Sequence, residues 1–302
     1  MRRSISLAVA AVMALSLAAA GSVGAQTPPS IIARYTSNYT GVQPPGRYID
    51  LQMTISEFDP GASSPANNFT SVRYVTVVEG AVRVTIGSET KDYATGTNFV
   101  IPGGAYVKIS NVGTTKAQIF LSSLRVAGTT PIQSLPPGEV IPSLVPRVVA
   151  TGTLPGIQVP TTGVTVQQAV ADWEAGAKNS PHMMNHPHLF IALGGENTTK
   201  YLDGTSNRIT SGQSASMTPG KPGIMENTGT TTARMYFVWV LTPGTPNTSP
   251  VTGTAAATIS PPSTGDAGLD RGGSDAGLVI GATAAALLAL AAVRGLASAV
   301  RR

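Results

Sequence analysis

All three histidines of this chain, His182, His186 and His188, lie within a stretch of seven residues. Imidazole is the commonest metal ligand in proteins. In an extended chain successive side chains alternate between two faces, which places the three histidines and Met184 on one face. Pro187 argues against a fully regular strand. Because imidazole and thioether donors suit copper, the cluster predicts one transition-metal site, with copper or another divalent ion. The alternative is a polar cluster at the surface.

These histidines belong to a longer pattern that occurs twice. The first copy contains Gly61, Asn67, Phe69, Arg73, Gly80, Gly96, Pro102, Gly104, Val107 and Asn111. The second copy contains Gly176, His182, Met184, His188, Gly195, Gly212, Pro219, Gly220, Gly223 and Asn227. The first half of the pattern recurs after 115 positions with identical offsets. Glycine and proline at such fixed places are typical of tight turns between strands, so the repeat indicates two similar domains.

The two halves of the pattern resemble the two motifs of the cupin family, G(X)5HXH(X)3-4E(X)6G and G(X)5PXG(X)2H(X)3N. The resemblance implies a bicupin, in which two double-stranded β-helix (jelly-roll) barrels follow one another. It also implies that four positions of each copy surround the site inside the barrel where the family binds a divalent metal. In the first copy these positions hold Asn67, Phe69, Arg73 and Val107. Such residues are poor metal ligands, so we expect no metal in the first barrel.

Arg73 stands where the family has a glutamate, and we single it out as a candidate ligand-binding residue. Strand alternation points it to the same side as Val75 and Val77, which the family pattern makes the barrel interior. A buried guanidinium is costly unless it is paired. We therefore expect Arg73 to meet Glu57 or Glu79, to lie at the surface instead, or to hold the carboxylate of a ligand.

The second copy keeps more of the family's metal chemistry. The resemblance places His182, Met184 and His188 at three ligand positions and Gly223 at the fourth. His186, which alternation adds to the same face, is a further candidate. The implied cofactor is at most one metal ion, in the second barrel. A barrel without a metal, which is structural or binds a small ligand, is the alternative.

The rest of the body is predicted to be all-β. Short β-rich runs such as 72–78 and 117–124 are broken by Gly, Pro, Asn or Asp, and sustained helical periodicity is missing. Regularly spaced short strands favour a sandwich or barrel. We predict a first barrel over 26–127, a proline-rich crossover over 128–160 and a second barrel over 161–242.

The two ends of the chain read as targeting segments. Residues 1–25, a basic start with an apolar run and small residues, are predicted to be a cleaved signal peptide. Residues 243–275 are predicted to be a flexible stalk that contains Pro261–Gly265, which resembles the sortase signal LPXTG. Residues 276–293 form an uncharged apolar stretch long enough to be a transmembrane helix, and 294–302 a basic cytoplasmic tail. Sortase attachment and a plain membrane anchor remain as alternatives. Either places the body at the outer face of the membrane or envelope.

Charge and composition exclude several classes of function. The chain has 20 basic and 15 acidic residues, but five of the basic ones lie in the two end segments, so the body is neutral. A neutral body without a basic cluster argues against nucleic-acid binding. The chain has no cysteine, so disulfides and thiolate ligands are excluded. It also lacks a G-x-S-x-G elbow, a phosphate loop and a zincin helix.

We therefore expect a surface-anchored bicupin that acts as a non-enzymatic binding or interaction module for a small molecule or a surface partner. The alternative is a metal-dependent cupin enzyme, a dioxygenase or isomerase, that uses the second barrel. Fold analogy does not choose between the two, because one fold hosts many functions.

Overall fold

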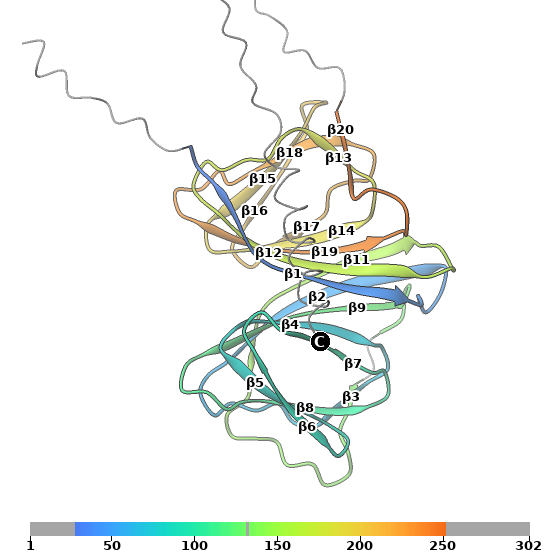
Figure 1. Cartoon of the computed structure of the whole chain (residues 1–302), viewed down its shortest axis with the longest axis vertical. Helices are drawn as coiled ribbons and strands as arrows, with labels where there is room; N and C mark the ends of the chain where they lie inside the picture. Colours follow the sequence, from blue (N-terminus) through green and yellow to red (C-terminus); the bar gives the residue numbers. More distant parts are fainter. Residues whose placement is uncertain (1–27, 131–132, 252–302) are drawn as a thin grey trace, which may run out of the picture. The chain divides into compact units, whose positions relative to one another are not determined.

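The computed structural model describes residues 28–130 and 133–251, and this part of the chain consists of strands and turns without a helix. Twenty strands form four antiparallel sheets of five strands each (Figure 1). The all-β prediction is confirmed. The predicted signal peptide, transmembrane helix, basic tail and sortase-like pentapeptide lie outside the described residues. Within the described ranges, no helix is long and apolar enough to cross a membrane.

Two of the sheets form the first sandwich, whose core joins apolar residues of both sheets. One sheet has the order β11 (Arg147–Gln158), β2 (Tyr48–Phe58), β9 (Ala117–Val126), β4 (Arg73–Glu79) and β7 (Asn98–Ile101). The other has the order β10 (Gln133–Ser134), β3 (Asn67–Phe69), β8 (Tyr106–Asn111), β5 (Ala81–Ile86) and β6 (Glu89–Ala94).

The other two sheets form the second sandwich around a core of its own. One sheet has the order β1 (Ile31–Val42), β12 (Val164–Trp173), β19 (Ala233–Leu241), β14 (His188–Leu193) and β17 (Ser214–Ala215). The other has the order β16 (Ser206–Thr210), β15 (Glu196–Tyr201), β18 (Pro222–Glu226), β13 (His182–Met184) and β20 (Thr248–Pro250). Both sandwiches have the two-sheet jelly-roll architecture, and the strands of the first correspond to those of the second.

The two sandwiches exchange their first strands. β1 precedes the first sandwich in sequence but pairs with β12 of the second, whereas β11 directly precedes β12 but pairs with β2 of the first. The proline-rich segment 128–160 therefore ends in a sheet strand and is a crossover only in its first part. Likewise, β20 lies in the segment predicted to be a stalk and extends a sheet of the second sandwich.

Each exchanged strand is anchored by an ion pair to the strand that receives it. Arg34 of β1 lies 2.6 Å from Asp172 of β12, and Arg147 of β11 lies 2.6 Å from Glu57 of β2. A third apolar core packs between the two sandwiches and includes Leu51, Tyr74 and Phe120 from one side and Val166 and Tyr236 from the other. Strands β2, β4, β9 and β12 are therefore covered on both faces.

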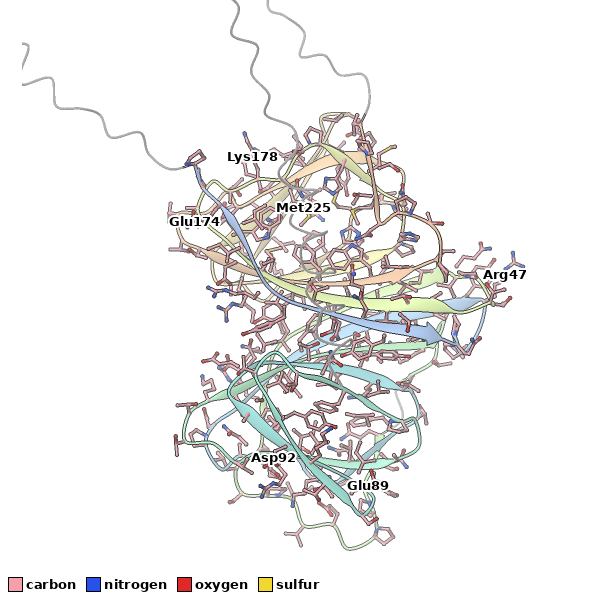
Figure 2. All side chains as sticks on the ribbon, in the orientation of Figure 1. Arg47, Glu89, Asp92, Glu174, Lys178 and Met225 are labelled. Carbon is pink, nitrogen blue, oxygen red and sulfur yellow. The ribbon has the colours of Figure 1, made fainter. Side chains whose placement is uncertain are left out.

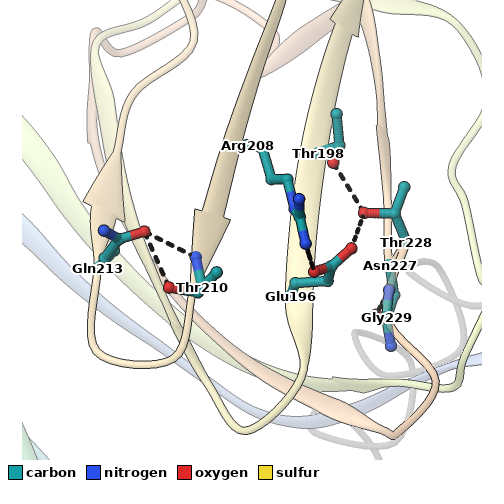
Figure 3. Close-up of polar contacts among 8 residues, drawn as sticks. All are labelled: Glu196, Thr198, Arg208, Thr210, Gln213, Asn227, Thr228 and Gly229. Carbon is teal, nitrogen blue, oxygen red and sulfur yellow. Dashed lines mark hydrogen bonds and ion pairs between the residues drawn. The ribbon is translucent and has the colours of Figure 1, made fainter.

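The repeated glycines and asparagines occupy equivalent turns. Gly80 and Gly195 both have positive φ, 67° and 62°, and a Cβ on Gly80 would lie 2.6 Å from the carbonyl oxygen of Lys116. Two motif asparagines use their whole amide in a turn, with bonds of 2.8 to 3.0 Å: Asn111 with Phe58, Thr115 and Gly113, and Asn227 with Trp173, Thr231 and Gly229. In the second sandwich, Glu196 links Arg208 and Thr228 next to this turn (Figure 3). These motif residues serve the fold.

Candidate functional site

The four family positions of the first copy lie close together inside the first sandwich. Asn67 of β3 is directly opposite Val107 of β8, and the guanidinium carbon of Arg73 lies 3.2 Å from the ring centroid of Phe69. The Asn67 amide oxygen accepts a hydrogen bond of 2.6 Å from Gln133. This set offers a metal one amide oxygen, which is already in use, together with a valine, an aromatic ring and a cation.

Arg73 lies on the interior face of the first sandwich, as strand alternation predicts. Val75 and Val77, which share its face of β4, belong to the sandwich core. Burial, followed by repulsion from Arg125, lowers the pKa of the Arg73 guanidinium to about 10. Its Nε is buried and has no hydrogen-bond partner in the described part of the chain. Arg73 is thus a charged group at neutral pH whose surroundings disfavour its charge.

The ion pair that we expected for Arg73 is not formed. Glu57 pairs instead with Lys116 at 3.1 Å and with Arg147 at 2.6 Å. Neither Glu79 nor any other carboxylate of the described residues lies within 4.0 Å of the Arg73 guanidinium. Within the described part of the chain, its charge is met by the face of Phe69, a cation–π contact.

Two further residues of this site were not identified from the sequence. Ser123 of β9 is directly opposite Arg73, and Arg125 follows on the same face of the strand. The Ser123 hydroxyl and the Arg125 Nε are buried, and no described residue hydrogen-bonds to either. Neither residue occupies a position of the repeated pattern. Only the alternation with Ile119 and Leu121, which are core residues, could have indicated their orientation.

The histidine cluster of the second copy does not form one continuous strand. His182 and Met184 lie in β13 and His188 begins β14, whereas His186 lies between the strands. His186 is buried, with Nε2 3.2 Å from the Thr245 carbonyl oxygen and Nδ1 3.3 Å from the Thr242 amide nitrogen. Both of its ring nitrogens are therefore engaged by backbone, and His186 holds a turn.

His188 is enclosed by aromatic rings. It stacks on Phe190 and Trp239 at centroid distances of 5.7 and 6.1 Å and is 1% exposed. Burial, with a smaller contribution from His182, lowers the pKa of His188 to about 3. Its Nδ1 is buried and makes no hydrogen bond to any of the described residues. His188 is therefore neutral at physiological pH, the form in which imidazole binds metals.

Metal binding in the second sandwich stays a prediction. The described residues contain no group of three or more His, Cys, Asp or Glu side chains that could hold an ion. A site there would combine His182 and His188 with the thioether of Met184. Met184 and Met225 are both buried in the apolar core of the second sandwich, where Figure 2 labels Met225. The His182 Nδ1 lies 2.9 Å from the Ser180 carbonyl oxygen, which leaves Nε2 as its metal-binding nitrogen.

Buried neutral His188 should make the protein sensitive to mild acid. Below pH 6.5 the unfolded chain binds a proton at His188 that the folded chain, with a pKa of about 3, does not bind. Stability should therefore fall as the pH falls, by about 2 kcal/mol between pH 6.5 and pH 5 from this residue alone. Urea unfolding of the full chain at pH 7 and pH 5 measures the loss. His188→Gln should lose about 2 kcal/mol less, and equal losses in both proteins would contradict a buried neutral His188.

A second cluster of charges lies in a cleft of 400 Å³ between the sandwiches, lined by Glu57, Gln118, Asp172, Arg234 and Tyr236 among others. Its charges are paired: Asp172 lies between Arg34 and Arg234, and Glu57 between Lys116 and Arg147. The Tyr236 hydroxyl bonds to Gln118. These groups satisfy one another, in contrast to those around Arg73.

Comparison with known proteins finds similar structures but no similar sequence. No family model and no curated protein matches this chain. A deletion mutant of Bacillus subtilis oxalate decarboxylase is 13% identical, with a TM-score of 0.44 over 71% of this chain and 79% of its own. Hazelnut (Corylus avellana) vicilin is 12% identical, with a TM-score of 0.48 over 68% and 85%. A cupin 2 conserved barrel domain protein from Leptotrichia buccalis is 14% identical, with a TM-score of 0.33 over 68% and 88%. These likenesses, to an enzyme and to a vicilin among others, favour neither function.

Proposed function

We propose that this chain is a bicupin displayed outside the cell, which binds a small anionic ligand inside its first sandwich and is not an enzyme. The observation that carries the proposal is the Arg73 guanidinium, which lies on the interior face and meets no carboxylate of the described residues. Taking a charge out of water costs several kcal/mol unless an opposite charge compensates it. A bound anion supplies that charge, and its contacts with guanidinium are charge-assisted and strong.

Binding rather than catalysis is supported by what surrounds Arg73. Its neighbours include Phe69, Val107, Asn67 and Ser123, none of which is a general base or a good metal ligand. Ser123 is an unactivated hydroxyl, because no histidine of the described residues bonds to it. The arrangement can hold and desolvate an anion.

The alternative function, a metal-dependent dioxygenase or isomerase, rests on the second sandwich. There His182, Met184 and His188 would hold the ion, and the metal would polarise a substrate as a Lewis acid or carry its redox chemistry. Elemental analysis of the full chain separates the alternatives. One equivalent of a transition metal in the wild type, lost in both His182→Ala and His188→Ala, together with turnover of a small substrate, would favour the enzyme.

Display outside the cell is supported by the sequence of both ends. A signal peptide over 1–25 and an apolar segment over 276–293 followed by three arginines would export the body and retain it. The ligand would then be an extracellular molecule or a partner at the same surface. The absence of cysteine from the chain fits a body that holds together without disulfides.

Anion binding is tested by thermal unfolding of the full chain in low-chloride buffer with phosphate, sulfate, acetate or propionate. A bound ligand at a hundredfold excess over its dissociation constant stabilises by about 2.7 kcal/mol. At least one of these anions should raise the Tm of the wild type by several degrees. Arg73→Met should abolish the shift. The matched control, Arg83→Met, removes an exposed arginine that pairs with Asp92 and should keep it. A wild type that no anion stabilises contradicts the proposal.

A further inference from the structure

Three unpartnered polar atoms lie along the interior face of one sheet of the first sandwich. They are the Arg73 Nε on β4 and the Ser123 Oγ and Arg125 Nε on β9, and each is buried without a hydrogen-bond partner among residues 28–130 and 133–251. Arg73 and Ser123 are directly opposite in the strand register, and Arg125 is two residues further along the same face. Leaving one buried polar group unsatisfied costs about 1–3 kcal/mol. Three such donors in one place are groups that a bound anion would satisfy.

The charges of this group favour a monoanion. Asp50 of β2 is directly opposite Arg125, but its two oxygens accept the backbone amides of Gly128 and Gly156, at 3.0 and 2.9 Å. Arg125 also donates one bond of 3.0 Å to the Thr129 carbonyl oxygen. Two guanidinium groups and one carboxylate leave a net charge of +1. A carboxylate neutralises this charge, whereas a phosphate dianion overcompensates it.

The other side of the site is apolar. The Phe69 ring lies against the Arg73 guanidinium, and Ile101 is directly opposite Arg73 on the side away from Ser123. On the other sheet of the sandwich, Val107 of β8 adds a further apolar side chain to the site. These side chains offer contacts to a short hydrocarbon body and no further hydrogen bonds.

Arg125 also lines a surface cleft. The cleft has a volume of 380 Å³ and lies where β4 begins and β9 ends. Besides Arg125 it is lined by Thr70, Ser71, Val72 and Thr129. Arg125 therefore belongs both to the buried polar group and to the lining of this cleft.

We infer that the ligand of the first sandwich is a small monocarboxylate with a short apolar body, an inference that rests on the proposed function. The Arg73 and Arg125 guanidinium groups donate to its two oxygens, and the Ser123 hydroxyl donates to one of them. Its apolar end packs against Phe69 and Ile101. Arg125 and Ser123 are then ligand-binding residues in addition to Arg73.

Isothermal titration of the full chain in low-chloride buffer tests this inference with propionate, phosphate and propionamide, the neutral isostere. Propionate should bind at least tenfold more tightly than phosphate, and propionamide should not bind measurably. Arg125→Met should weaken propionate binding at least tenfold and Ser123→Ala about fivefold, while Arg83→Met should match the wild type.

The titrations distinguish failure of the monocarboxylate site from failure of the anion-binding function. Phosphate that binds as tightly as propionate, or Arg125→Met within twofold of the wild type while Arg73→Met abolishes binding, overturns the monocarboxylate site and leaves the anion-binding function in place. If neither anion binds the wild type, both are overturned. Circular dichroism and the Tm of each variant show whether lost binding is lost folding.

Discussion

Arg73→Met is expected to stabilise the ligand-free protein and to abolish anion binding at the same time. The lowering of the Arg73 pKa to about 10 by burial and by Arg125 corresponds to about 3 kcal/mol of disfavoured charge. Methionine keeps an unbranched apolar chain on the interior face and removes that charge. Loss of the contact with Phe69 destabilises the folded protein by about 1–2 kcal/mol. The free energy of unfolding should therefore rise by about 1–2 kcal/mol, measured by urea unfolding in low-chloride buffer.

A paired or exposed Arg73 would behave differently. Breaking a buried ion pair destabilises by about 3–5 kcal/mol, and an exposed substitution changes stability by less than about 0.5 kcal/mol. A gain in stability with a loss of binding is typical of a residue kept for function. If Arg73→Met destabilises the protein by 3 kcal/mol or more, the guanidinium has a partner in the protein and the ligand site is wrong.

Gln168→Leu is expected to destabilise the protein by about 3 kcal/mol or more, because it leaves several buried polar groups unsatisfied. Gln168 is 1% exposed on β12, where its amide reaches across to the first sandwich. Its Nε2 donates to the Tyr74 carbonyl oxygen and to Ser122, at 3.0 and 2.9 Å, and its Oε1 accepts from Thr76 at 2.7 Å. Leucine fills a similar volume without these bonds.

The matched control is the neighbouring residue. Gln167 makes one exposed hydrogen bond of 2.8 Å to Asn38, so Gln167→Leu should change stability by less than about 1 kcal/mol. Urea unfolding of the full chain, followed by circular dichroism, compares the two variants. Equal effects would show that the buried hydrogen bonds between the sandwiches contribute no more to stability than one exposed hydrogen bond does.

The repeat made much of the fold predictable. Gly80 and Gly195 require positive φ, and Asn111 and Asn227 close equivalent turns, so their spacing fixes where strands end. Alternating apolar residues then determine which face of each strand is buried. Such local signals are sufficient to predict two similar β domains.

The exchange of first strands could not be predicted in this way. β1 and β11 occupy equivalent positions 116 residues apart, and either could pair with β2 or with β12. The choice depends on contacts between residues that are distant in sequence, such as Arg34 with Asp172. Local propensity and periodicity carry no information about such pairs.

The candidate site was likewise predictable from the sequence only in part. Alternation predicted that Arg73 points inward, but it could not show that Glu57 is taken by Lys116 and Arg147. It also missed Arg125, which belongs to no motif. In the second copy, Pro187 indicated the break in the strand that turns His186 toward backbone atoms.

The central claim is that the interior of the first sandwich holds a small carboxylate at Arg73. A crystal structure of the full chain grown with 3-bromopropionate tests it most directly, because bromine gives an anomalous signal that marks the ligand. We predict one strong bromine peak inside the first sandwich, beside Phe69, with the carboxylate between Arg73 and Arg125. At a saturating ligand concentration, bromine found only at the surface or in the second sandwich, with the Arg73 guanidinium still unpartnered, would contradict the account.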